Sequence, residues 1–75
     1  MDERVLDWSR GRRIRILMMA VPGDYERLLR RVEEEARRTD DEDRLADDVG
    51  AIFNDYVRLQ RREVDGVEEI VLKVG

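Results

Sequence analysis

The sequence contains no cysteine and no histidine, and each absence excludes a class of chemistry. Without cysteine the chain can form neither a disulfide nor a zinc site with thiolate ligands. Without histidine it lacks the commonest general base and the commonest metal ligand of proteins. Ser9 and Thr39 are the only serine and threonine, and no imidazole can activate them. We therefore expect no catalytic residues, no bound metal and no cofactor.

Proline, aromatic side chains and long apolar runs are also scarce. Pro22 is the only proline, and aromatic residues make up 5% of the chain. No apolar run approaches the roughly 20 residues that a membrane-spanning helix needs. The first ten residues, MDERVLDWSR, are acidic, whereas the start of a secretory signal is basic. These features predict a cytoplasmic protein that does not associate with a membrane.

Charged residues, in contrast, make up 45% of the sequence, and the net charge is -4. The chain is expected to fold because 41% of its residues are hydrophobic. Its 75 residues fit one small α+β domain, 1–75, of a size that is marginally stable alone, so help from a partner chain is expected. Lys73 is the only lysine beside fourteen arginines. This bias also fits a designed protein without a biological function, which stays an alternative.

The first third of the sequence predicts a β-hairpin. Residues 3–8 and 12–21 are rich in β-forming residues, and the stretch SRG between them fits a turn. The second strand is apolar on both faces, with Ile14, Ile16, Met18 and Ala20 on one side and Leu17, Met19 and Val21 on the other. A strand of this kind is expected to be covered on both sides.

Two helices are predicted next. The first begins near Asp24, and its apolar stripe has helical spacing and consists of Tyr25, Leu28, Leu29, Val32 and Ala36. Thr39 and Glu42 have the spacing of a capping box, which predicts a second helix. Apolar residues keep the helical period without a break, so we predict one helix over residues 41–61. After a turn at residues 64–66, residues 67–74 are predicted to form the last strand.

The predicted element order is therefore ββααβ. Counting reversals of chain direction gives a three-stranded antiparallel sheet of order 1-2-3, with two antiparallel helices on one face. We expect the helices to cover the face of the central strand that carries Ile16, because that face is apolar along its whole length.

The other face of this sheet needs a different cover, and its residues form the predicted interface. They combine a polar rim with an apolar centre, as interfaces do, and are Arg13, Arg15, Leu17, Met19 and Val71. Ala46 and Gly50 lie one helical turn apart and would let a neighbouring backbone approach closely. We predict a non-catalytic interaction module that forms a homodimer or binds another protein.

The stretch MMAVPGDYERLLRRV, within residues 12–57, resembles the start of ribbon-helix-helix DNA-binding proteins. The resemblance implies that strands from two chains pair and present alternate side chains to the major groove, while the second helix begins at a phosphate. Here the groove-facing residues would be Ile16, Met18 and Ala20, which offer no hydrogen bonds to bases. The acidic residues 40–43 would repel the phosphate.

Residues 45–75 resemble a helix-turn-helix motif with a wing. LADDVG is similar to the first helix and turn, and FNDYVRLQRR then corresponds to the recognition helix. The resemblance implies that Asn54, Arg58, Gln60 and Arg61 contact DNA. However, the apolar stripe runs through Gly50 without a change of phase, whereas a turn there would break it. A small dimeric DNA-binding regulator is therefore the alternative function, and nucleic acid is the disfavoured partner.

Two charged clusters remain. The acidic cluster could bind Mg²⁺ or Ca²⁺, but it lacks the spacing of an EF-hand loop, and its place at a helix start explains it; its members are Asp40, Asp41, Glu42, Asp43, Asp47 and Asp48. The basic cluster could bind an anionic partner or could be a solvated strand end, and consists of Arg10, Arg12, Arg13 and Arg15. Trp8 is expected to anchor a core or an interface.

Overall fold

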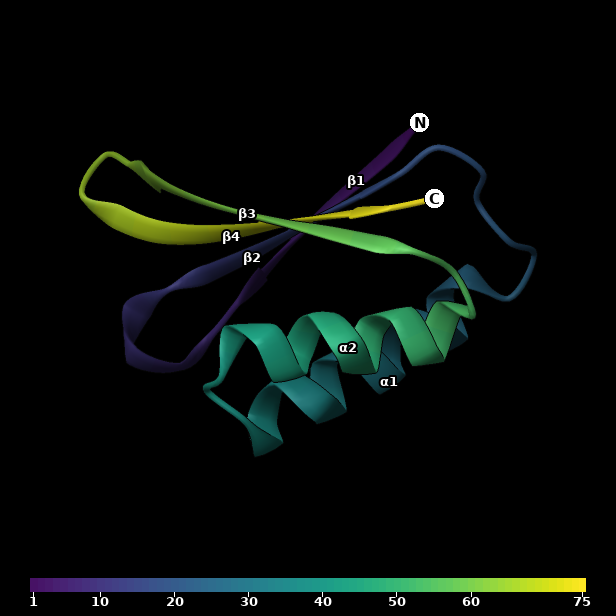
Figure 1. Ribbon diagram of the computed structural model, residues 1–75, viewed down its shortest axis with the longest axis horizontal. Coiled ribbons are helices and arrows are strands. Elements are labelled where there is room, and N and C mark those ends of the chain that lie inside the picture. The colour runs from purple at the N-terminus through teal and green to yellow at the C-terminus, as the bar shows by residue number, and fades with distance from the viewer.

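In the computed structural model, which describes residues 1–75, a four-stranded sheet carries two helices on one of its faces (Figure 1). The strands are β1 (Asp2–Asp7), β2 (Arg13–Met18), β3 (Val57–Val64) and β4 (Val67–Val74). The helices α1 (Tyr25–Arg38) and α2 (Glu42–Phe53) lie between β2 and β3 in the chain. A short 3-10 helix, η1 (Ser9–Gly11), joins β1 to β2. The α+β class of this small domain agrees with the sequence.

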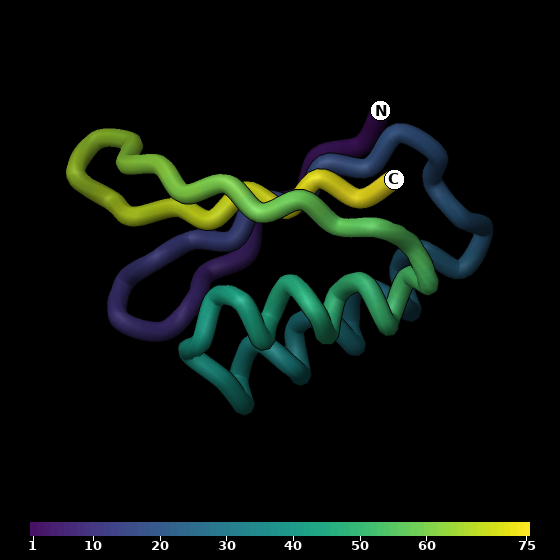
Figure 2. The backbone as a smooth tube through the Cα atoms, viewed as in Figure 1, coloured from purple at the N-terminus to yellow at the C-terminus, as the bar shows by residue number.

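The sheet consists of two antiparallel hairpins, β1–β2 and β3–β4, which join through parallel pairing of β2 with β4. Its strand order is β1-β2-β4-β3. The predicted three-stranded antiparallel sheet of order 1-2-3 is therefore wrong. Residues 57–64 form an additional strand, and its reversal of chain direction turns the last strand parallel to β2. The turn between β3 and β4 lies at the end of the molecule opposite to the two termini (Figure 2).

Helix α1 agrees with the sequence, because all five residues of its predicted apolar stripe are buried. Helix α2 begins as an N-capped helix, although the cap differs from the predicted one. The side chain of Asp41 accepts a hydrogen bond from the backbone N–H of Arg44 at 3.1 Å, and the Thr39 hydroxyl accepts one from the N–H of Asp41. Asp41 thus takes the place that the sequence assigned to Thr39.

Helix α2 ends at Phe53, so the predicted helix over residues 41–61 is also wrong. Asn54 adopts a left-handed conformation, with φ of 51°, and its N–H donates to the carbonyl of Ala51. The N–H of Asp55 donates to the carbonyl of Gly50 at 3.1 Å. These two bonds form a Schellman motif, which closes the helix with asparagine in the position that glycine usually holds.

The strand β2 is shorter than predicted. It ends at Met18 rather than near residue 21, and Met19 and Val21 lie in the following loop with 74% and 48% of their surface exposed. The apolar stretch MMAV, residues 18–21, therefore extends beyond the last paired residue, and residues 19–21 are not part of the strand.

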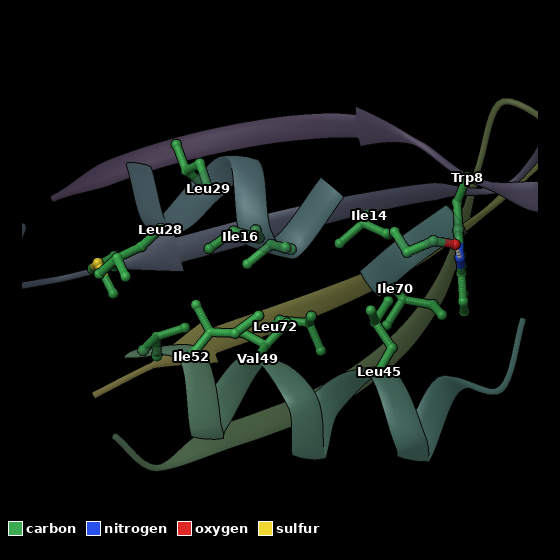
Figure 3. Close-up of a cluster of buried hydrophobic side chains, with 14 of the residues drawn as sticks. Trp8, Ile14, Ile16, Leu28, Leu29, Leu45, Val49, Ile52, Ile70 and Leu72 are labelled. Carbon is green, nitrogen blue, oxygen red and sulfur yellow. Dashed lines mark hydrogen bonds between the residues drawn. The ribbon is translucent and has the colours of Figure 1, made fainter. Parts of the chain in front are cut away.

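The core lies between the helices and one face of the sheet. In Figure 3, Ile14 and Ile16 of β2 lie toward α1, whereas Ile70 and Leu72 of β4 lie toward Leu45 and Val49 of α2. All fifteen core residues form one continuous cluster. No helix is long and apolar enough to cross a membrane.

Trp8 closes one end of this core. Its indole N–H donates to two carbonyl oxygens, each at 3.0 Å. One belongs to Ala36 near the end of α1, and the other belongs to Thr39, the C-cap of that helix. The guanidinium of Arg12 lies over its ring, 3.8 Å from the ring centre. Trp8 thus ties the β1–β2 connection to the end of α1, as the sequence predicted for an anchor.

The Schellman motif generates a stability prediction. Asn54→Ala should lower the free energy of unfolding by about 1 kcal/mol, because an alanine Cβ is strained in the left-handed region that asparagine tolerates. Asn54→Gly should be at least as stable as the wild type, because glycine has no Cβ. Urea denaturation of the two variants tests this, and equal stability of the two would contradict a left-handed residue at this position.

Candidate functional site

The face of the sheet away from the helices is the candidate functional site, and we call it the open face. In Figure 1 it is the side of the sheet opposite to α1 and α2. Because side chains alternate along a strand, every second residue of each strand points to this side. Pairing aligns these residues in three rows that cross all four strands, which are Asp7, Arg13, Glu69 and Arg62; then Val5, Arg15, Val71 and Gln60; then Glu3, Leu17, Lys73 and Arg58. Val64 and Val67 form one further pair on this face, at the turn between β3 and β4.

A carboxylate lies at the centre of the first row. Glu69 is completely buried, although no helix covers this face. Nε of Arg15 lies 2.5 Å from Oε1 of Glu69, and Nη2 of Arg62 lies 2.8 Å from the same oxygen. Nη2 of Arg13 lies 3.4 Å from Oε2. Three arginines from β2 and β3, the strands on either side of β4, therefore shield the carboxylate from water.

The arginines also fix one another's positions through this shared carboxylate. Arg15 donates to Glu3 on β1 as well as to Glu69 on β4, so it spans three adjacent strands. In the middle row Val71 is only 3% exposed. The open face is thus a partly dehydrated layer of arginine stems, with Leu17 half-buried beside it.

The ion pairs shift the acidity of this site. The hydrogen bond from Arg15 to Glu69 lowers the pKa of Glu69 to about 2, although burial of the carboxylate opposes this change. The same bond, with that to Glu3, raises the pKa of Arg15. Glu69 therefore stays ionised at every physiological pH, and it serves as a fixed charge that organises the arginines around it.

Several polar groups of the open face have no counterpart within the chain. Asp7 and Arg58 form no ion pair, although both are exposed at the two opposite edges of the sheet. Nε of Arg13 is buried and has no hydrogen-bond acceptor. A buried donor without an acceptor costs free energy.

The structure brings four of the five predicted sheet-interface residues together. Arg13, Arg15 and Leu17 alternate along β2, and Val71 lies beside Arg15 on β4. Met19 does not belong with them, because it lies in the loop after β2. The helix-facing side of β2 carries Ile14, Ile16 and Met18, as predicted, whereas Ala20 is exposed beyond the strand.

Ala46 and Gly50 are separated from the open face by the core. Gly50 is closely approached, but by its own chain: a Cβ at this position would lie 3.2 Å from the carbonyl oxygen of Asp55 and 3.6 Å from a methyl group of Val57. The turn into β3 therefore occupies the surface at Gly50 that was predicted to contact a partner.

The residues assigned to DNA contacts are dispersed. Asn54 ends α2, and Arg58 and Gln60 lie on β3 at the open face. Arg61 points to the other side, where it binds Glu42 at 2.7 Å and Asp43 at 3.4 Å. No recognition helix exists over these residues, because they form a strand. Both edges of β2 are also paired within the chain, which leaves no edge for the intermolecular ribbon of a ribbon-helix-helix protein.

The two charged clusters are engaged locally. Arg10 pairs with Asp40 at 2.8 Å, and Arg12 donates to Ser9 and to the carbonyl of Asp40. Arg13 and Arg15 belong to the Glu69 network, so the basic cluster divides between a loop and the open face. No group of acidic side chains comes together in an arrangement that could hold a metal ion.

A shallow groove of about 740 Å³ lies between the C-terminal end of β1 and the C-terminal end of α1. Its apolar part consists of Val5, Leu6, Trp8 and Ala36, and charged residues such as Arg37 and Asp40 also line it. No charged side chain that lines this groove is buried, whereas the open face holds the buried Glu69.

Sequence reasoning missed Glu69, Arg62 and Lys73 as members of the site. Their signal was the stretch VRLQRREV-DG-VEEIVLKV, in which two strand-like runs flank the pair Asp65-Gly66. Both turn residues have positive φ, at 52° and 79°, as a tight type I′ hairpin turn requires. Recognising this hairpin would have placed Arg62 opposite Glu69.

Comparison with known proteins finds no matching family model, no matching curated protein and no matching solved structure.

The Glu69 network generates a prediction on stability and pH. Glu69→Gln should lower the free energy of unfolding at pH 7 by about 1–3 kcal/mol, because the arginines lose a charged acceptor but can partly rehydrate. The folded state holds the pKa of Glu69 below its ordinary value of 4.5, so its ionised form stabilises the fold above that pH. This contribution should fade as the pH falls from 4.5 towards 2, and the wild type and variant should converge.

Urea denaturation at several pH values between 7 and 2.5 measures this difference. Glu68→Gln is the matched control, because Glu68 is the exposed neighbour on the opposite face and lies beside Glu63 rather than arginine. The control should change stability by less than about 0.5 kcal/mol. A wild-type advantage over Glu69→Gln that stays constant down to pH 2.5 would show that the carboxylate charge is not what stabilises the network.

Proposed function

We propose that this domain is a cytoplasmic, non-catalytic assembly module that self-associates through its open face. The observation that carries the proposal is the buried Glu69 on a face without helices, held by Arg13, Arg15 and Arg62. Burying a charge is costly unless it is fully paired, and here the pairing produces a rigid, partly dehydrated surface. Such a surface needs little further ordering when a second protein chain docks on it.

The sheet topology supports the same proposal. Sheets built only of parallel strands are covered on both faces, and this mixed sheet contains one such parallel pair. Here the parallel pair β2–β4 is at the centre of the sheet, yet only one of its faces packs against helices. A partner chain on the open face would give this parallel pair the second cover that all-parallel sheets have.

The composition of the open face also suits a protein interface. Arginine is enriched in interfaces because it offers several donors on a largely apolar stem. Leu17 supplies a half-buried apolar surface beside the arginines, and Val5 adds apolar surface on the edge strand with 46% of its surface exposed.

A second candidate is the binding of nucleic acid on the same face. It is favoured by one observation, the gathering of five basic side chains, namely Arg13, Arg15, Arg58, Arg62 and Lys73. Affinity for nucleic acid depends on basic groups that are free to neutralise phosphates. Three of the arginines are already bound to Glu69, so self-association remains the better supported function.

Aspartate substitutions on the two faces of β2 test the proposal. The wild type should be a dimer by light scattering. Leu17→Asp should raise the dissociation constant of the dimer at least about tenfold while the helical circular dichroism signal is kept, because the carboxylate is hydrated once the partner leaves. Ile16→Asp should unfold the chain, because it buries an unpaired charge in the core.

Val21→Asp is the control for a new charge at an apolar position outside the open face, and it should leave both mass and fold unchanged. A wild type that is monomeric at about 1 mM would refute self-association, since that concentration detects even weak dimers. A folded Leu17→Asp dimer of unchanged affinity would place the interface elsewhere on the molecule.

A further inference from the structure

The charges on the open face define how a second copy docks. We infer that two chains pack open face against open face about a two-fold axis that runs parallel to the strands, with β1 of each chain over β3 of its partner. This inference rests on the proposed function and adds to it the orientation of the two copies. It follows from the way the strand register distributes acidic and basic residues over the four strands.

The two edge strands carry opposite charge on the open face. The edge strand β1 presents Glu3 and Asp7, and no basic residue lies on this side of it. The other edge strand, β3, presents Arg58 and Arg62 there, with the neutral Gln60 between them. The face is therefore acidic along one edge and basic along the other.

Symmetry limits the ways in which two such faces can meet. Homodimers are usually related by a two-fold axis, so that the same patch is used twice. When two sheets pack face to face, their strands stay nearly aligned and the sheets lie about 10 Å apart. A two-fold rotation about an axis parallel to the strands exchanges the two edge strands. It does not change the position of a residue along the strand direction. It therefore places β1 over the partner's β3 and β2 over the partner's β4, with each row facing the same row.

This arrangement brings opposite charges together at the edges of the two outer rows. In the first row Asp7 faces the partner's Arg62. In the third row Glu3 faces the partner's Arg58. The two-fold axis repeats each of these pairs. Arginine and carboxylate side chains are together long enough to bridge the spacing between packed sheets.

The middle row supplies the less charged centre of the same interface. Val71 faces the stem of the partner's Arg15, and Val5 faces the partner's Gln60. No like charges oppose one another in this row.

The dimer also provides opposite charges for groups that have none in a single chain. Asp7 and Arg58, which form no ion pair within the chain, both face residues of opposite charge. Both groups meet an opposite charge when β1 of each chain lies over β3 of its partner.

The competing two-fold arrangement is disfavoured by the same residues. An axis perpendicular to the strands places every strand over its own copy, so that acidic β1 meets acidic β1 and basic β3 meets basic β3. Like charges facing each other in an interface are strongly unfavourable. A head-to-tail contact between the open face and the acidic helix α2 would not close, and it would produce larger assemblies rather than dimers.

Two complementary charge reversals test the orientation. In the Arg58→Glu homodimer, position 58 would face the partner's Glu3, and in the Glu3→Arg homodimer, position 3 would face the partner's Arg58. Each homodimer thus contains two repulsive pairs, and its dissociation constant should rise at least about tenfold. In an equimolar mixture the heterodimer contains two attractive pairs, so the mixture should dimerise with an affinity near that of the wild type.

Analytical ultracentrifugation of each variant and of the mixture measures these constants, and circular dichroism verifies that each variant is folded. Arg44→Glu and Asp47→Arg are the matched controls. They make the same charge changes on exposed residues of α2, on the other side of the molecule, and should leave the dissociation constant unchanged.

Each other outcome overturns the inference in a recognisable way. Tighter homodimers of Arg58→Glu and Glu3→Arg would show that each strand faces its own copy. Weakening by Asp47→Arg, with masses above that of a dimer, would show head-to-tail contacts with α2. Variants that dimerise like a dimeric wild type would refute the orientation while the proposed function stands, whereas a monomeric wild type would refute both.

Discussion

The parallel pairing of β2 with β4 is the constraint on which the rest of the structure depends. It joins two hairpins that are far apart in the sequence, and it requires the helical crossover because parallel neighbours cannot be linked by a tight turn. On one side of the sheet, this register places Ile14 beside Ile70 and Ile16 beside Leu72, under the helices. On the other side it places Arg13 beside Glu69. The core and the charged surface are thus two consequences of one register.

The open face shows how a charged side chain can be buried without a second layer of structure. Glu69 is completely buried on this face, and the guanidinium groups of Arg15 and Arg62 replace its lost water contacts. The cost of removing a carboxylate from water is offset only when several donors converge on it. Because those donors come from β2 and β3, the carboxylate also links the two hairpins on this face.

The local elements were largely predictable from the sequence, whereas the topology was not. The stripe of α1 and the last strand follow from spacing alone. The end of α2 was missed because Val57 and Leu59 fit the helical period as well as the alternation of a strand. Asn54, the residue that decides between the two, carries a weaker stop signal than glycine. Because β3 was missed, one reversal of chain direction was not counted. The last strand was therefore predicted to run antiparallel to β2, whereas β4 is parallel to it.

The candidate site was only partly predictable for a related physical reason. Periodicity identified which side of β2 faces away from the helices, so Arg13, Arg15 and Leu17 could be named from one strand. The charge pattern, in contrast, belongs to no single segment: it arises when Glu3, Glu69 and Arg58 are aligned by three separate strand pairings. Net charge and local clusters carry no trace of it, because the chain is acidic as a whole while this face is basic along one edge. Self-complementarity of this kind is a property of register, and a sequence reveals it only after the order of its strands is known.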